Sequence, residues 1–167
     1  MLFRSFFGLL TITDPATATS TLLKLSNRQL LNASSSASVG NLFLGLDAGA
    51  GITNGTLNTG FGYQALQNAT TTGSNVALGY QALQGSTTNF TGTQNTAVGV
   101  QALQAAATGG RNVAVGYQAL LANTTGADNT VVGNQAMVVN TTGGSNTAFG
   151  SKSLQSNVSG EIGRAHV

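Results

Sequence analysis

The sequence predicts an all-β protein: a parallel β-solenoid (β-roll) of about seven 17-residue rungs, assembled as a trimer. Two observations predict this fold. A short asparagine-containing motif recurs at a fixed interval, and every copy carries glycine and apolar residues at the same offsets. A fixed period is typical of solenoids, in which each repeat covers the exposed face of its neighbour. Composition agrees, because 41% of the residues are apolar and 6% are charged, whereas disordered chains combine low hydrophobicity with high net charge.

Each rung begins with an asparagine. We number this residue offset 0 and count the other residues of the rung from it. Five of the six intervals are 17 residues, and the third, from Asn75 to Asn95, is 20. Because the pattern resumes directly afterwards, we expect the extra residues in a surface loop within residues 85–94. We predict a buried ladder in which each asparagine amide bonds the amides above and below it. Asn112 should therefore matter far more to stability than Asn123, which falls in a turn. The ladder residues are Asn41, Asn58, Asn75, Asn95, Asn112, Asn129 and Asn146.

The next elements are short β-favouring runs interrupted by a glycine at offset 4. Such runs predict two short strands per rung, and a glycine in every copy disfavours a helix. Alternation along the first strand places small residues inside the coil and the apolar residue of offset 3 outside. A continuous exposed apolar stripe usually marks a subunit interface, so we expect a homotrimer. The repeat glycines are Gly45, Gly62, Gly79, Gly99, Gly116, Gly133 and Gly150. The predicted interface residues are Phe61, Leu78, Val98, Val115, Val132 and Phe149.

The repeat also carries a family resemblance. The pattern N-x-A-x-G, as in residues 112–116, resembles the head repeats of trimeric autotransporter adhesins. The GYQAL variant with TTG turns is similar to repeats of phage tail-fibre and bacterial surface proteins that end in an endosialidase-type intramolecular chaperone. The resemblance covers Asn41 to about Gly160, although the adhesin repeat is shorter and its second half usually differs from YQAL. It implies a left-handed parallel β-roll of three chains, located outside the cell on a bacterial surface or a virion tail fibre.

The chain divides into four segments. Residues 2–5 and 162–165 can be back-translated into reverse-complementary strings that resemble a sequencing-library adapter. We therefore expect residues 1–5 and 161–167 to be adapter read-through; a signal peptide is the alternative explanation of the apolar start. Residues 6–40 are predicted to be an irregular segment and linker, in which residues 22–31 form either a short strand or a helical turn. Residues 41–160 hold the seven-copy solenoid.

The chemistry of the remaining residues argues against catalysis. Without the two end segments the chain has no His, Cys or Glu, and its net charge is +1. Hydrolysis needs a base that titrates near neutrality or a pair of carboxylates, whereas Asp14, Asp47 and Asp128 are solitary. We expect no enzyme, no metal and no cofactor. No basic cluster suits nucleic acid, and no apolar run approaches the ~18 residues of a membrane span.

These observations predict a structural segment of a fibrous surface adhesin or phage tail fibre, acting as a rigid shaft or head without catalysis. The alternative is a carbohydrate- or receptor-binding head that uses the exposed tyrosines Tyr63, Tyr80 and Tyr117 and loop residues. Its partner would be a host-surface glycan or protein receptor. Threonine clusters such as residues 70–72 suggest an ice-binding face. Such a face needs a threonine at one offset in every rung on a flat side, which this sequence lacks.

Overall fold

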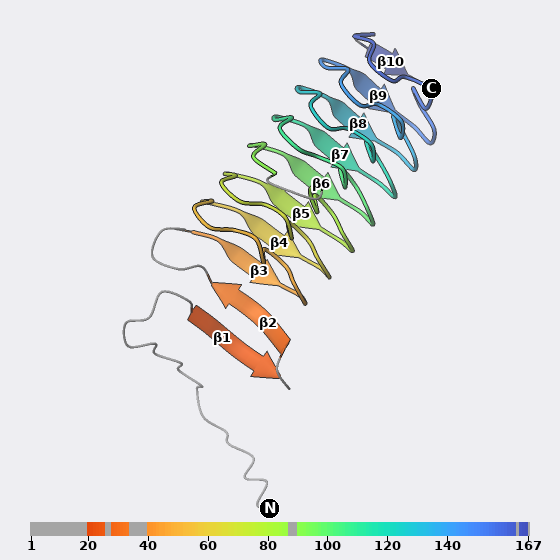
Figure 1. The fold of residues 1–167 in the computed structure, drawn as a ribbon. Coiled ribbons are helices and arrows are strands. Elements are labelled where there is room, and N and C mark those ends of the chain that lie inside the picture. Colours follow the sequence, from red (N-terminus) through yellow and green to blue (C-terminus); the bar gives the residue numbers. More distant parts are fainter. Residues whose placement is uncertain (1–19, 26–27, 34–39, 87–89, 163, 167) are drawn as a thin grey trace, which may run out of the picture.

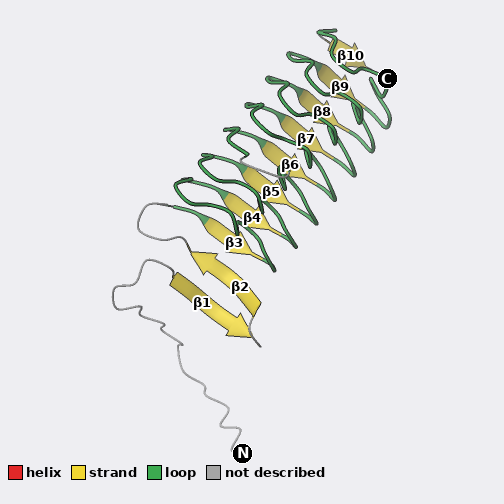
Figure 2. Ribbon diagram, viewed as in Figure 1, coloured by secondary structure: helices red, strands yellow, loops and turns green. Residues whose placement is uncertain are grey.

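The computed structural model describes residues 20–25, 28–33, 40–86, 90–162 and 164–166. Within them, ten strands form one sheet in chain order and no helix occurs (Figure 1 and Figure 2). The strands are β1 (Ser20–Leu25), β2 (Arg28–Ala33), β3 (Leu42–Leu44), β4 (Thr59–Phe61), β5 (Val76–Leu78), β6 (Thr96–Val98), β7 (Val113–Val115), β8 (Thr130–Val132), β9 (Thr147–Phe149) and β10 (Arg164–His166). The predicted all-β solenoid is confirmed.

Seven parallel strands, β3 to β9, form the solenoid, and each residue lies opposite its equivalent in the next rung. Ala97, for example, pairs with Ala114. The longer interval does not disturb this register, because Val76 of β5 pairs with Thr96 of β6. Figure 1 shows the rungs stacked one after another along a single axis.

The expectation of two strands per rung is wrong for the described residues, which contain one three-residue strand per rung. The second apolar segment, Tyr-Gln-Ala-Leu in residues 117–120, forms a series of turns. Gln118 and Leu120 have φ angles of 53° and 55°, in the left-handed region. Consequently the neighbouring side chains of Ala119 and Leu120 are both fully buried, whereas a strand would send successive side chains to opposite faces.

The coil interior is filled by the small residue of offset 2 and by the turn residues of offsets 7 and 8. Ala114, Ala119 and Leu120 illustrate the pattern, and each is fully buried. The first rung departs from it by exchanging volume between two positions: Phe43 stands at offset 2, and Gly49 replaces leucine at offset 8. A Cβ on Gly49 would lie 2.6 Å from the Phe43 ring. The ring therefore fills the space that leucine fills elsewhere, as close packing requires.

The repeat glycines of offset 4 stand where the coil turns away from the strand. Their φ angles lie between 110° and 150°, a region that favours glycine. The rungs also approach closely there, since a Cβ on Gly79 would lie 2.6 Å from the carbonyl oxygen of Gly99. Backbone conformation accounts for this residue in every copy, and the close approach of the next rung adds a second reason from Gly45 to Gly133.

The longer interval contributes a core residue as well as a loop. Phe90 is fully buried and pairs through an isolated bridge with Ala69. A Cβ on Gly92 would lie 2.6 Å from the Phe90 ring, so the glycine leaves room for it. The expectation of a purely surface loop over residues 85–94 is therefore incomplete, because part of the inserted segment packs inside the coil.

The strands at the two ends of the sheet can be compared with the segments predicted from the sequence. Residues 6–40 were expected to be irregular, but β1 and β2 form an antiparallel pair, and β2 pairs antiparallel with β3. Of the two alternatives for residues 22–31, the strand is therefore the one observed in the described part. At the other end, β10 pairs in parallel with β9. Residues 1–5 lie outside the described residues, and strand pairing does not test whether either end is read-through.

Candidate functional site: side-chain ladders and the strand face

The asparagines of offset 0 form a continuous hydrogen-bonded ladder inside the coil. Asn112 donates its backbone N–H to Asn95 Oδ1 at 2.9 Å and its side-chain Nδ2 to the same oxygen at 3.1 Å. Its Nδ2 also donates to the carbonyl oxygen of Gly126 at 2.9 Å. The structure places all seven predicted ladder residues in this column, and each is buried. At the longer interval, Asn95 reaches Asn75 Oδ1 through its backbone N–H, at 2.8 Å.

A second asparagine column, at offset 11, consists of Asn123, Asn140 and Asn157. Asn140 Nδ2 donates to Asn123 Oδ1 at 3.0 Å and to the carbonyl oxygen of Gly143 at 3.0 Å. Asn123 and Asn140 are fully buried. Asn123, which was predicted to lie in a turn and to matter far less to stability than Asn112, therefore belongs to a ladder of its own. The available signal was the spacing Asn-x-x-Gly, which recurs in three rungs.

Two columns of glutamine cross the surface of the turn segments. Offset 6 carries Gln64, Gln81, Gln101, Gln118 and Gln135, joined amide to amide at 2.9 to 3.2 Å. Offset 9 carries Gln67, Gln84 and Gln104, joined at 2.8 and 3.0 Å. The sequence alone predicted no role for these residues. Their amide-to-amide hydrogen bonds form further ladders, in the partly buried outer layer of the coil.

The outward side of β3 to β9, which we call the strand face, carries the side chains of offsets 1 and 3. The predicted interface residues Phe61, Leu78, Val98, Val115 and Val132 are half-buried there, and Phe149 is 42% exposed. Offset 5 follows with tyrosine in three rungs. No charged residue occurs at offsets 1, 3 or 5. The result is a continuous uncharged strip along the sheet.

Two of the offset-5 tyrosines stack on each other. The ring centroids of Tyr63 and Tyr80 are 5.6 Å apart, and the ring planes differ by 13°. Each ring therefore covers a face of the other. The row is then interrupted by Val100, and Tyr117 stands beyond it.

A row of exposed threonines appears when offsets are counted back from the following asparagine. The residue four positions before it is Thr71, Thr91, Thr108, Thr125 or Thr142 in five successive rungs, and all five are exposed. Counting forward also gives a threonine in each of these rungs, at offset 13, with Thr88 in place of Thr91. It is a single row, and the exposed column next to the asparagine varies from Ser74 to Arg111 and Asp128. It thus lacks the flat array that an ice-binding face needs.

The charged groups lie on the solvent side of the coil. Arg111 Nε is 2.6 Å from Asp128 Oδ1, with side-chain exposures of 61% and 45%. The hydrogen bond from Arg111 lowers the pKa of Asp128 below its usual value, and the same bond raises the pKa of Arg111. A pair exposed in this way contributes little to stability. Within the described residues, no three His, Cys, Asp or Glu side chains gather to hold a metal ion.

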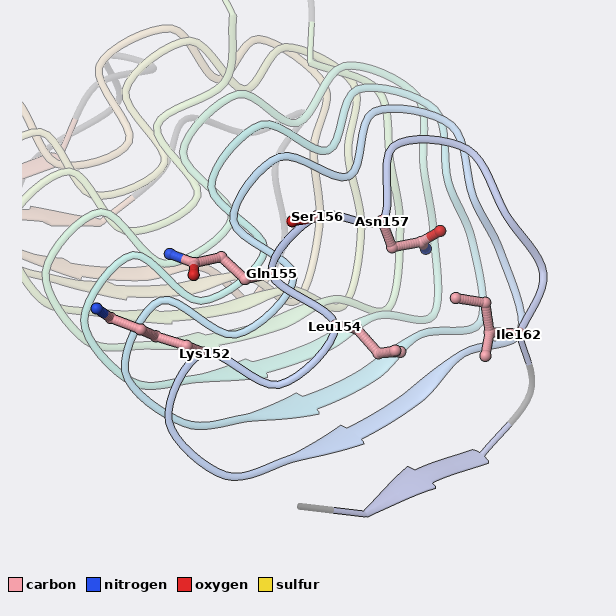
Figure 3. A pocket seen from close by; sticks show the side chains of 6 residues that line it. All are labelled: Lys152, Leu154, Gln155, Ser156, Asn157 and Ile162. Atoms are coloured by element: carbon pink, nitrogen blue, oxygen red, sulfur yellow. The ribbon is translucent and has the colours of Figure 1, made fainter.

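A hollow of about 600 Å³ lies at the far end of the described stack, lined by Lys152, Leu154, Gln155, Ser156, Asn157 and Ile162 (Figure 3). Leu154 is partly exposed there, whereas its equivalents Leu120 and Met137 are fully buried beneath the following rung. The hollow is therefore the part of the last rung that a neighbouring rung covers elsewhere. We assign it no chemistry.

Comparison of the chain with protein-family models, with curated proteins and with solved structures gave no match. The described residues include no helix of the length and hydrophobicity needed to span a bilayer. Function must therefore be argued from the geometry of the coil and from the resemblance of its repeat.

Proposed function

We propose that the chain is a structural segment of a fibrous surface adhesin or phage tail fibre, located outside the cell, and that it acts as a rigid shaft or head without catalysis. The resemblance of the repeat supplies the class of protein. The bonding of the coil supports the rigid role, because no buried side-chain nitrogen or oxygen of the described residues lacks a partner. A fully satisfied polar network rigidifies the structure that contains it.

The homotrimer is the second part of the proposal, and the uncharged strand face is the observation that carries it. Apolar patches that run continuously over a surface mark sites of association. The stacked rings of Tyr63 and Tyr80 extend this strip. The charges of Arg111 and Asp128 sit at the offset before the asparagine, two residues before offset 1 and outside the strip of offsets 1, 3 and 5. A second and a third copy would bury the strip and leave this ion pair in water.

The binding-head alternative receives less support from the tyrosines. Sugars bind aromatic residues through the open ring face, and Tyr63 and Tyr80 cover one face of each other. Val100 then breaks the row. This arrangement suits packing against protein better than an extended sugar-binding platform.

Thiol labelling of the full chain tests the assembly, because the sequence contains no cysteine. Leu44, on the strand face, and Val139, at offset 10, are each 41% exposed in the single chain. We expect Leu44→Cys to react many-fold more slowly than Val139→Cys with a bulky maleimide, since only the first thiol is covered by another copy.

Circular dichroism of both variants checks that the fold is retained. Equal labelling rates in two folded variants would contradict assembly through the strand face. A slow rate for Leu44→Cys that becomes fast on dilution would tie the protection to association rather than to the coil itself.

A further inference from the structure

A second hollow, of about 330 Å³, opens on the turn side of the coil where the repeat is interrupted. Its lining consists of Asn68, Gln84, Gly85, Ser86, Gln104 and Ala105. These residues occupy offsets 9 to 11 of three successive rungs. The strand face occupies offsets 1 and 3, so the hollow is not part of the proposed interface.

The hollow lies where the longer interval interrupts the backbone hydrogen bonds between one rung and its two neighbours. Up to Ser86 the chain bonds to the following rung, with Ser86 N–H donating to the carbonyl oxygen of Ala106 at 3.1 Å. Phe90 bonds to the preceding rung, with its N–H donating to the carbonyl oxygen of Asn68 at 3.1 Å, and Thr91 N–H donates to Ala107 of the following rung at 2.8 Å. Gly85, whose φ is 84°, turns the chain between them.

Gln104 presents at the hollow an amide oxygen of fixed orientation that accepts no hydrogen bond from the described residues. Its Nε2 donates to Gln81 Oε1 at 2.9 Å and to Gln84 Oε1 at 3.0 Å, which determines the orientation of the amide. In the other rungs of this column the amide oxygen accepts from the next glutamine. After Gln104 the column ends, because the next rung carries Leu121 at that offset. No described residue donates to Gln104 Oε1.

Two further oxygens line the same hollow without a donor from the described residues. Asn68 Nδ2 donates to the carbonyl oxygen of Gly85 at 3.1 Å, which leaves Asn68 Oδ1 as an open acceptor. The Ser86 hydroxyl bonds no described residue, and a hydroxyl can both donate and accept. The Ala105 methyl group adds a small apolar surface beside them.

We propose that this hollow binds a neutral, hydroxyl-rich ligand, namely one saccharide unit of a glycan. Saccharide hydroxyls would donate to Gln104 Oε1 and Asn68 Oδ1 and exchange a hydrogen bond with Ser86. The lining carries no charge, so it offers no cation for a phosphate or an acidic sugar. It also lacks the carboxylates with which proteins hold Ca²⁺. Its volume is at the lower end of small-molecule sites, as a single ring requires.

Titration of the full-length chain with D-glucose, D-galactose and N-acetyl-D-glucosamine, followed by NMR chemical shifts, tests the proposal. We expect at least one of them to bind with a Kd of about 1–10 mM, as for a site of a few hydrogen bonds. Gln104→Leu should weaken this binding at least about tenfold, because it removes the fixed acceptor. Leucine already stands at this offset in the next rung, so the coil accommodates it.

Gln135→Leu is the matched control, because Gln135 also ends a glutamine column, at offset 6, but lies outside the hollow. It should bind as the wild type does. Ser86→Ala provides a second variant in case Gln104→Leu does not fold, and it should also weaken binding. Failure of all three sugars to bind, or unchanged binding in a folded Gln104→Leu variant, would overturn the proposal. Neither result would affect the proposed shaft role, which does not depend on this site.

Discussion

A buried asparagine amide has two N–H donors and one acceptor oxygen, and the coil provides partners for all of them. Asn129 donates its backbone N–H and its Nδ2 to Asn112 Oδ1 and also donates its Nδ2 to the carbonyl oxygen of Gly143. The amide thus joins three parts of the structure: its own strand, the previous rung and the turn before the next one. Few other side chains combine this size with this donor and acceptor pattern, which explains why the residue recurs at offset 0.

The first prediction concerns the two asparagine columns. Asn112→Leu should lower the free energy of unfolding by more than about 2 kcal/mol, because the Asn129 N–H would lose its partner inside the coil. Asn123→Leu should cost somewhat less, since Asn140 Nδ2 would still reach the Gly143 carbonyl. Urea unfolding monitored by circular dichroism measures both changes.

Thr125→Leu is the control for this pair, because Thr125 is exposed and lies two residues from Asn123. It should change the free energy of unfolding by less than about 0.5 kcal/mol, as is usual for exposed positions. If Asn112→Leu were as mild as Thr125→Leu, the ladder would not be a source of stability.

At the scale of one rung, the strand could be predicted from the sequence and the turn segment could not. Alternation of small and bulky residues over residues 112–116 identifies a strand with one face inward. The following segment buries Ala119 and Leu120 side by side only because Gln118 and Leu120 adopt left-handed backbone angles. Such angles are uncommon for residues other than glycine, so propensity gives no indication of them. Stacking against identical turns above and below enforces them.

The second prediction is that the Phe43 ring fills the space that a leucine side chain would fill at position 49. Phe43→Ala should lower the free energy of unfolding by about 3–5 kcal/mol, because it leaves a cavity in the core. Adding Gly49→Leu should restore much of the loss, since the pair would then match the alanine and leucine of the other rungs. Leucines at this offset have φ angles of 47° to 55°, close to the 62° of Gly49.

Thermal and urea unfolding of the two single variants and the double variant measure this coupling. Gly49→Leu alone should be destabilising, because its side chain would collide with the Phe43 ring. Additive losses in the double variant would mean that the ring and the missing leucine do not share one space.

At the scale of the whole molecule, the repeat gave the architecture, and its interruptions were harder to interpret. The period predicted a parallel stack, and the register across Val76 and Thr96 follows it. The burial of Phe90, the glutamine columns and the hollow near Gln104 depend on how rungs contact each other in space. One-dimensional spacing contains no such contacts.

The central claim is that the coil is a subunit of a larger fibre, held to its copies by an uncharged strand face. The most direct test is the solution mass of the full chain, by light scattering during size exclusion, with circular dichroism on the same sample. We expect a β-rich species of three times the 16.7 kDa of one chain. A stable β-rich monomer at the same concentration would contradict it, and the strand face would then need no partner.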